Sequence, residues 1–191
     1  MSRTAYCRIA AALAAVLLWH GRALAGPEAI EVLVGTGEGT LDNPQPNIND
    51  SHLVVAFCYD LKPFLDRKLG WRPGGEWQYR IEPFVSIVNR PKSRTEAGAM
   101  FAIKASWKAG PVSVYAKGGT GTMYTSLDTL EQATRLNFVH YAAIGLSCRV
   151  SKDASVSVER WVRHYSNARI AIPNSGIDTS DWLVGYTWDL H

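Results

Sequence analysis

The feature that most constrains the fold of this chain is an alternation of apolar and polar residues. Near the C-terminus every second residue is apolar, and the residues between are small or polar; the apolar set is Trp182, Val184, Tyr186, Trp188 and Leu190. Successive side chains of a β-strand point to opposite faces, so this period of two predicts a strand with one apolar face. Only Leu183 breaks the pattern.

The same alternation recurs upstream and predicts eight strands, at residues 30–37, 52–59, 77–87, 101–108, 112–115, 142–150, 154–166 and 178–191. Several of them carry Arg, Lys or Glu on the face opposite the apolar one. That face would meet water in a soluble sandwich or a lipocalin-like barrel, and a polar lumen in a membrane barrel. The even strand number, the aromatic residues near strand ends and an export signal favour an all-β, eight-stranded antiparallel transmembrane β-barrel.

The export signal is predicted at residues 1–25. Arg3 and Arg8 accompany an apolar run too short to span a bilayer, and Ala23-Leu24-Ala25 fits a cleavage site. Residues 26–191 then form one barrel domain in the cell outer membrane. Without the signal the chain has 17 basic and 17 acidic residues, which removes the main support for nucleic-acid binding. No later segment reaches the ~18 apolar residues of a transmembrane helix.

The connections between strands predict the orientation of the barrel. Residues 108–111 and 150–153 suit tight periplasmic turns, whereas 38–51, 118–137 and 167–181 suit long external loops. We interpret Gly118-Gly119-Thr120-Gly121 as part of such a loop. Residues 60–76 do not fit a short turn, and either hold a short helix or extend the strands.

Strand parity also bears on the thiols and on metal binding. Cys58 falls on the lumenal face of its strand and Cys148 on the outer face, so we expect no disulfide between them. We expect no cofactor and no metal, because Cys, His and acidic residues do not cluster at ligand spacing. No phosphate-binding glycine motif follows a strand either.

The candidate chemistry lies on the strand at residues 154–166. Val156 and Val158 set its outer face, which places His164 and Ser166 on that face near the external end, where an imidazole can serve a hydroxyl as base. Polar side chains that face lipid are costly, so a functional role would explain them. The alternative is that the pair lies above the bilayer edge, where polarity costs little. Asp178 shares the outer parity of the last strand and should lie beside His164, where a carboxylate can orient the ring. Asp178 could instead be an ordinary loop carboxylate, and Asp181 could then take its place as the acid.

The motif His164-Tyr165-Ser166-Asn167-Ala168, followed by Pro173-Asn174-Ser175-Gly176 and an acid, resembles the signature of the PagL-type lipid A 3-O-deacylases. The resemblance implies an outer-membrane esterase that removes the ester-linked 3-hydroxyacyl chain at position 3 of lipid A. It implies Ser166 as nucleophile, His164 as base and Asp178 as acid. Asn167 would contribute to the oxyanion hole, or alternatively turn the chain out of the strand.

Two residues depart from the family pattern. The acid is Asp178 where the best-known members carry Glu, and the chain ends in His191 where outer-membrane barrels usually end in an aromatic residue.

The expected partner is lipid A, or lipopolysaccharide, with its phosphates bound by arginine. Arg163 and Arg169 are the preferred candidates among basic residues expected at the external rim, which also include Arg90, Lys92, Arg94 and Arg135. Two other functions remain open: a non-enzymatic barrel for adhesion or membrane integrity, and an acyltransferase acting on lipid A. Formation of a homodimer is also left open.

Overall fold

The computed structural model describes residues 26–41, 47–90, 92–127 and 129–190. The predicted signal peptide at residues 1–25 and the terminal His191 lie outside the described residues.

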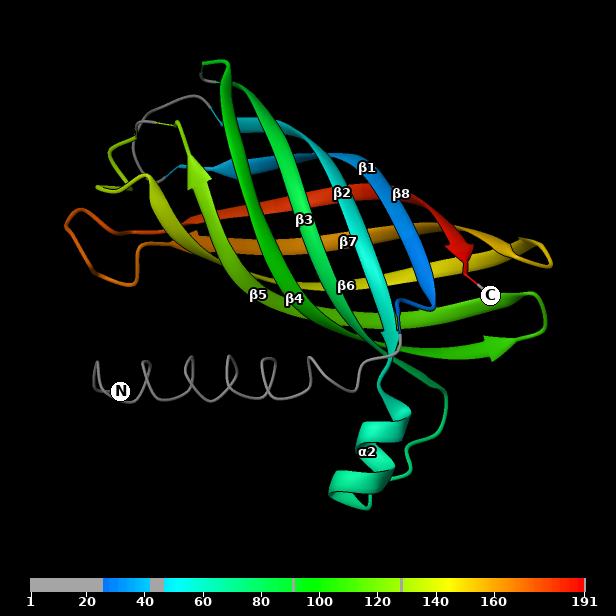
Figure 1. Cartoon of the computed structure of the whole chain (residues 1–191). Helices are drawn as coiled ribbons and strands as arrows, with labels where there is room; N and C mark the ends of the chain where they lie inside the picture. Colours follow the sequence, from blue (N-terminus) through cyan, green and yellow to red (C-terminus); the bar gives the residue numbers. More distant parts are fainter. Residues whose placement is uncertain (1–25, 42–46, 91, 128, 191) are drawn as a thin grey trace.

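Eight antiparallel strands form a closed barrel in which each strand pairs with its neighbours in sequence and β8 pairs back with β1 (Figure 1). The strands are β1 Ala29–Thr40, β2 Ile48–Asp60, β3 Glu76–Arg90, β4 Arg94–Ala109, β5 Val112–Thr125, β6 Leu136–Ser151, β7 Ala154–Ser166 and β8 Ile177–Asp189. The predicted eight-stranded antiparallel barrel is therefore confirmed. Most strands are longer than predicted, so the connections between them are shorter.

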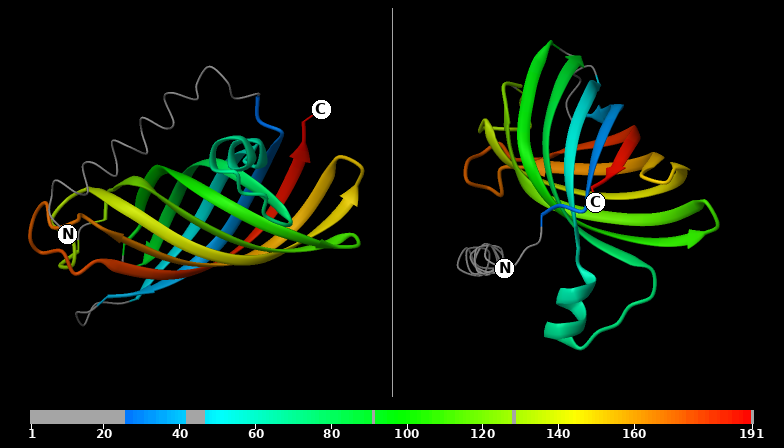
Figure 2. Two further views of the ribbon diagram at one scale, coloured as in Figure 1. Left: turned by 90° about the horizontal axis from the view of Figure 1, so that it is seen from below. Right: turned by 45° about the vertical axis from the view of Figure 1, so that its right-hand side comes forward.

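The two ends of the barrel differ in their connections, as Figure 1 shows. At one end β4–β5 and β6–β7 are joined by tight turns, the first with Gly110 in the left-handed conformation (φ 65°). The β2–β3 connection at this end holds α2, Lys62–Leu69, which stands outside the barrel (Figures 1 and 2). Pro63 lies in its first turn and Gly70 ends it with φ 62°, as helix termini favour. No helix among the described residues is long and apolar enough to cross a membrane.

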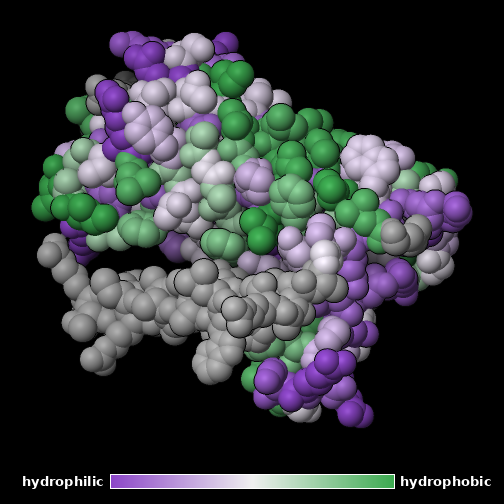
Figure 3. All heavy atoms as spheres, in the orientation of Figure 1, coloured by the Kyte–Doolittle hydropathy of each residue, from purple (hydrophilic) through white to green (hydrophobic). Residues whose placement is uncertain are grey.

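The outer wall is apolar and the interior is charged, which reverses the arrangement of a soluble protein. Large apolar side chains such as Val34, Val85, Ile103, Ile144 and Val184 are about half exposed or more. Figure 3 shows hydrophobic residues on the flank of the barrel and hydrophilic ones on α2 and at the ends. This is the arrangement of a membrane-spanning barrel.

The predicted placement of the thiols is also confirmed. Cys58 is buried, Cys148 is partly exposed, and both are free.

The interpretation of residues 118–121 as a loop is wrong, because they lie within β5. Glycine weakens a strand, but here it makes room for close packing inside a narrow barrel. A Cβ at Gly119 would lie 2.5 Å from Cε1 of the buried Tyr141, and one at Gly121 would overlap the backbone of Ala99.

Two clusters of buried charges occupy the lumen, separated by apolar side chains. The cluster nearer the tight β4–β5 and β6–β7 turns, here called the turn-side cluster, comprises Glu31, Arg80, Glu82, Lys104, Lys117 and Glu159. The cluster nearer the opposite end, here called the loop-side cluster, comprises Asp50, His52, Glu96, Arg163 and Asp181. The inward-facing order along β7 is Glu159, Trp161, Arg163, so Trp161 lies between the clusters. Leu183 also faces the lumen, on β8 opposite Glu159, and is fully buried, which explains why it broke the sequence alternation.

Candidate active site

His164 and Asp178 meet on the outer wall because they are direct cross-strand partners on β7 and β8. Nδ1 of His164 lies 2.7 Å from Oδ1 of Asp178, and the two side chains are 44% and 75% exposed. At this distance the Nδ1–H group donates to the carboxylate, which fixes the ring and leaves Nε2 available as a base. Asp181, the alternative acid, faces the lumen and is buried.

Ser166 lies two residues after His164 on the same face of β7 and is partly exposed. Its cross-strand partner is Phe138 on β6. Within the described part of the chain its hydroxyl makes no hydrogen bond to His164 or to any other group. The structure thus brings the imidazole of His164 and the carboxylate of Asp178 into contact, and it leaves the Ser166 hydroxyl on the same face without a hydrogen bond.

The loop after Ser166 is held by Asn167, which is fully buried. Its backbone N–H donates to Oδ1 of Asn174 over 2.7 Å, and its side-chain amide donates to the Pro173 carbonyl over 3.4 Å. Ala168 and Arg169 follow with φ of 52° and 62°. In this conformation Asn167 ties the loop together, which matches the alternative role of turning the chain out of the strand.

Gly176 packs against the His164 ring, a contact that the sequence did not reveal. It has φ 83°, and a Cβ at this position would lie 2.5 Å from Cε1 and 3.0 Å from Nε2 of His164. The backbone therefore approaches the edge of the ring more closely than any side chain permits. Only its place in the loop motif, two residues before Asp178, could have suggested this.

A second imidazole lies beside the pair. His140 on β6 is the direct cross-strand partner of His164, and its Nδ1 lies 2.8 Å from Oγ1 of Thr120 on β5. The sequence interpretation missed both residues because it began β6 at residue 142 and placed Thr120 in a loop. Extending the alternation of β6 upstream through Phe138 would have found His140.

Arg163 was expected at the external rim, and that placement is wrong. Arg163 directly precedes His164 on β7, so its side chain points to the opposite face, into the lumen. It is 1% exposed, and its Nη2 lies 2.6 Å from Oδ2 of Asp50. Arg169 instead lies exposed in the loop after β7. The other basic residues expected at the rim border the β3–β4 and β5–β6 connections at the same end; they are Arg90, Lys92, Arg94 and Arg135.

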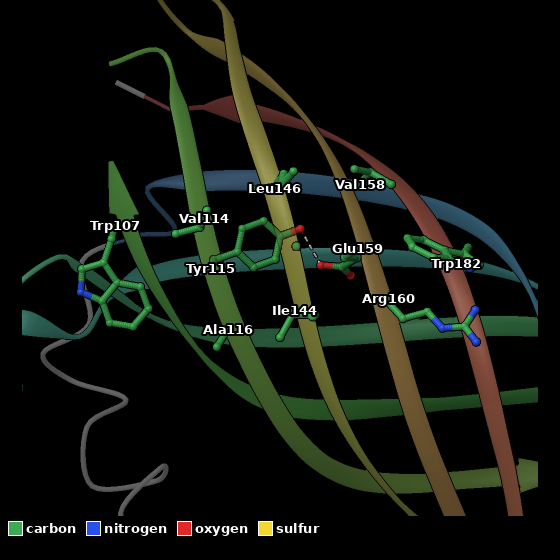
Figure 4. A pocket seen from close by; sticks show the side chains of 11 residues that line it. Trp107, Val114, Tyr115, Ala116, Ile144, Leu146, Val158, Glu159, Arg160 and Trp182 are labelled. Atoms are coloured by element: carbon green, nitrogen blue, oxygen red, sulfur yellow. Dashed lines mark hydrogen bonds between the residues drawn. The ribbon is translucent and has the colours of Figure 1, made fainter. Parts of the chain in front are cut away.

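Farther down the outer wall lies a shallow groove of about 480 Å³, shown in Figure 4. Its outward-facing lining is almost entirely apolar and includes Val114, Ile144, Leu146 and Val158. Arg160 lies at one edge, with its guanidinium 5.1 Å from the centre of the Trp182 ring. Along β7 the groove begins four residues before His164.

The lumen holds a group of potential metal ligands that sequence spacing did not reveal. Asp50, His52 and Asp181 are all buried and each offers one ligand atom within 4.8 Å of the others. They come from β2 and β8, so only the closure of the barrel brings them together.

Comparison with solved structures places the fold among small outer-membrane barrels. The outer membrane enzyme PagL is 16% identical with a TM-score of 0.58, over 85% of this chain and 99% of that one. Neisserial surface protein A (NspA) is 8% identical with a TM-score of 0.59, over 85% of this chain and 96% of that one. Because an enzyme and a surface protein match equally well, the fold alone does not decide the function.

The sequence comparison is more specific. A comparison with curated proteins gives no match. The family model for lipid A 3-O-deacylase (PagL), however, matches residues 58–187, more than half of the chain and a range that includes His164, Ser166 and Asp178. The chain therefore belongs to the PagL family of lipid A 3-O-deacylases.

Proposed function

We propose that the chain is a serine esterase of the outer membrane that removes the 3-hydroxyacyl chain ester-linked at position 3 of lipid A. The observation that carries the proposal is the 2.7 Å contact between His164 and Asp178 on the lipid-facing wall, with the free hydroxyl of Ser166 beside it. Polar groups at such a position are costly, and a reaction on a lipid gives a reason for that cost.

In this mechanism Nε2 of His164 takes the proton of the Ser166 hydroxyl as its oxygen attacks the ester carbonyl. Collapse of the tetrahedral intermediate breaks the ester bond, and His164 returns the proton to the departing sugar hydroxyl. Water, activated by the same imidazole, then releases the 3-hydroxy fatty acid from Ser166. Asp178 acts throughout by orienting the ring and stabilising its charged form.

The oxyanion needs donors close to Ser166. The backbone N–H groups of Ala168 and Arg169 are suited to this, because in the described residues neither is used in a hydrogen bond. Asn167 is less suited, since its backbone N–H is already donated to Asn174.

The surroundings suit a substrate with a charged head and several acyl chains. In this proposal the end of the barrel opposite the tight turns faces outward, so Arg169 lies near the head groups and pairs with a phosphate. The apolar groove below the site, with Ile144 and Val158 in its lining, offers a surface for an acyl chain that stays in the bilayer. The ester bond lies between these two parts of the lipid, as the site lies between these two surfaces.

The proposal is tested by incubating the refolded protein with lipid A in detergent and measuring product masses. We expect the loss of one 3-hydroxyacyl group with wild type and no loss with Ser166→Ala. Ser180→Ala is a matched control, because Ser180 lies on the outer face of the neighbouring strand β8 but is paired with Val162 and not with His164; it should retain activity. An unchanged mass with wild type would contradict the esterase and favour a non-enzymatic barrel. A gain in mass would point to an acyltransferase.

A further inference from the structure

The loop-side cluster in the lumen lacks positive charge when compared with the turn-side cluster. The turn-side cluster balances three carboxylates with Arg80, Lys104 and Lys117, whereas the loop-side cluster has three carboxylates and, apart from His52, only Arg163. None of the turn-side charged groups has a buried polar atom without a hydrogen-bond partner. The loop-side cluster has four such atoms: Glu96 Oε2 and a group of three, Asp50 Oδ1, His52 Nε2 and Asp181 Oδ1. Buried unpartnered polar atoms are costly and need an explanation.

These three atoms lie within 4.8 Å of one another. His52 Nε2 lies 3.0 Å from Asp50 Oδ1 and 3.5 Å from Asp181 Oδ1, and it forms an ion pair with each when the ring is protonated. Neither contact has the alignment of a hydrogen bond. Ligands bound about 2.1 Å from one zinc ion, at angles of roughly 90–120°, lie about 3.0–3.6 Å apart. The two separations fall in that range.

The other polar atom of each side chain is already held by a neighbour. His52 Nδ1 lies 2.6 Å from Ser86 Oγ, Asp50 Oδ2 accepts from Arg163 over 2.6 Å, and Asp181 Oδ2 accepts from Thr179 over 3.2 Å. Metal ligands in proteins are usually oriented by such outer partners.

Gly37 leaves space for this arrangement. It lies on β1, between the two strands that supply the ligands (Figure 1), and a Cβ there would overlap both carboxylates.

We propose that Asp50, His52 and Asp181 bind one divalent transition-metal ion, and that Zn²⁺ fits this set of one imidazole nitrogen and two carboxylate oxygens. Its two charges would balance the three carboxylates together with Arg163. The ion would link β2 to β8 across β1. It would lie on the lumenal face of β8, whereas Asp178 lies on the outer face of the same strand. It is a structural site, independent of the proposed esterase activity.

The test uses untagged protein refolded in detergent without metal and then titrated with Zn²⁺ by calorimetry. Bound metal is counted by mass spectrometry after gel filtration, and thermal unfolding is followed with and without the ion. We expect one Zn²⁺ per chain, a higher unfolding temperature with Zn²⁺, and no binding of Mg²⁺ at the same concentration.

Two variants change proposed ligands, and a third serves as the control. His52→Gln and Asp181→Asn should each weaken Zn²⁺ binding by at least about tenfold and remove the thermal shift, while His140→Gln, which removes an imidazole on the outer wall, should leave both unchanged. If the first two do not refold, Ser86→Ala serves instead, and loss of its bond to His52 should weaken binding by about tenfold. No Zn²⁺ uptake by wild type would overturn the proposal and assign the charge balance to protons on His52 and Glu96. Undiminished uptake by His52→Gln or Ser86→Ala would also overturn it.

Discussion

Near the end of the barrel opposite the tight turns, β7 and β8 carry charged side chains on both faces. Those on the outer face are exposed, and those on the lumenal face are buried. On the outer face the ion pair of His164 and Asp178 is largely exposed. One residue away, Arg163 points inward to the buried carboxylate of Asp50, and Asp181 lies inward on β8. An exposed pair contributes about 0–1 kcal/mol to stability, whereas removing one partner of a buried pair costs about 3–5 kcal/mol.

The comparison indicates that parity separates two tasks on the same strands. Inward-facing charges hold the barrel together, because each is desolvated and depends on its partners. Outward-facing charges contribute little to stability, and in the proposed function they act on a lipid. Substitutions of one type on opposite faces should therefore move different observables.

The largest expected effect on stability follows removal of a buried cation. In Lys117→Met, Glu159 and Glu82 lose a partner whose Nζ lies 2.7 and 3.5 Å from their oxygens. We expect a loss of about 3–5 kcal/mol in the free energy of unfolding, measured in urea with lipid vesicles. Lys152→Met, at a lysine whose side chain is 89% exposed, should change stability by less than about 0.5 kcal/mol. Equal losses in the two variants would contradict the role assigned to the lumen.

The same substitution on the two faces of β8 should separate rate from stability. Asp178→Asn should lower the deacylation rate by roughly 10²- to 10⁴-fold, because the amide no longer stabilises the charged imidazole, and should leave unfolding nearly unchanged. Asp181→Asn should show the reverse, with lower stability and a rate per folded molecule close to wild type. Both are measured by lipid A turnover together with thermal unfolding.

Gly176→Ala should disturb the outer face alone. The added Cβ would meet the His164 ring and the backbone has φ 83°, so the ring or the loop must shift from its present position. We expect roughly a tenfold lower rate and about 1 kcal/mol lower stability. A rate equal to wild type would show that the ring position is not critical.

The smallest expected effect is at the rim. Arg169→Gln should raise KM by about two- to threefold with little change in kcat, because an exposed charge pairs weakly with phosphate. The difference from wild type should shrink as salt is added. A change in kcat alone would argue against a role in binding the head group.

The barrel and its outer site could be predicted because both follow from a period of two. Val156 and Val158 fixed the outer face, and counting forward from them placed His164 and Ser166 correctly. The same count places Arg163 in the lumen. Its expected position at the rim took account of its place near the end of β7 but not of the face to which its side chain points.

Other features depend on contacts that a single strand does not encode. Gly119 is compatible with a strand only because Tyr141 fills its space from β6. The group of Asp50, His52 and Asp181 requires the closure of β8 against β1, and the contact between Gly176 and His164 depends on the path of a loop. Each is a product of tertiary packing between residues far apart in the sequence.

The most direct test of the central claim replaces one serine on each face of β7. Ser166 lies on the outer face, and Ser157 lies in the lumen, where its hydroxyl donates to Glu31 over 2.8 Å. Lipid A turnover and unfolding temperature are measured for Ser166→Ala and Ser157→Ala side by side. We predict that Ser166→Ala abolishes release of the 3-hydroxyacyl chain at an unchanged unfolding temperature, and that Ser157→Ala lowers the unfolding temperature but keeps activity. Continued release of the chain by folded Ser166→Ala would contradict the account.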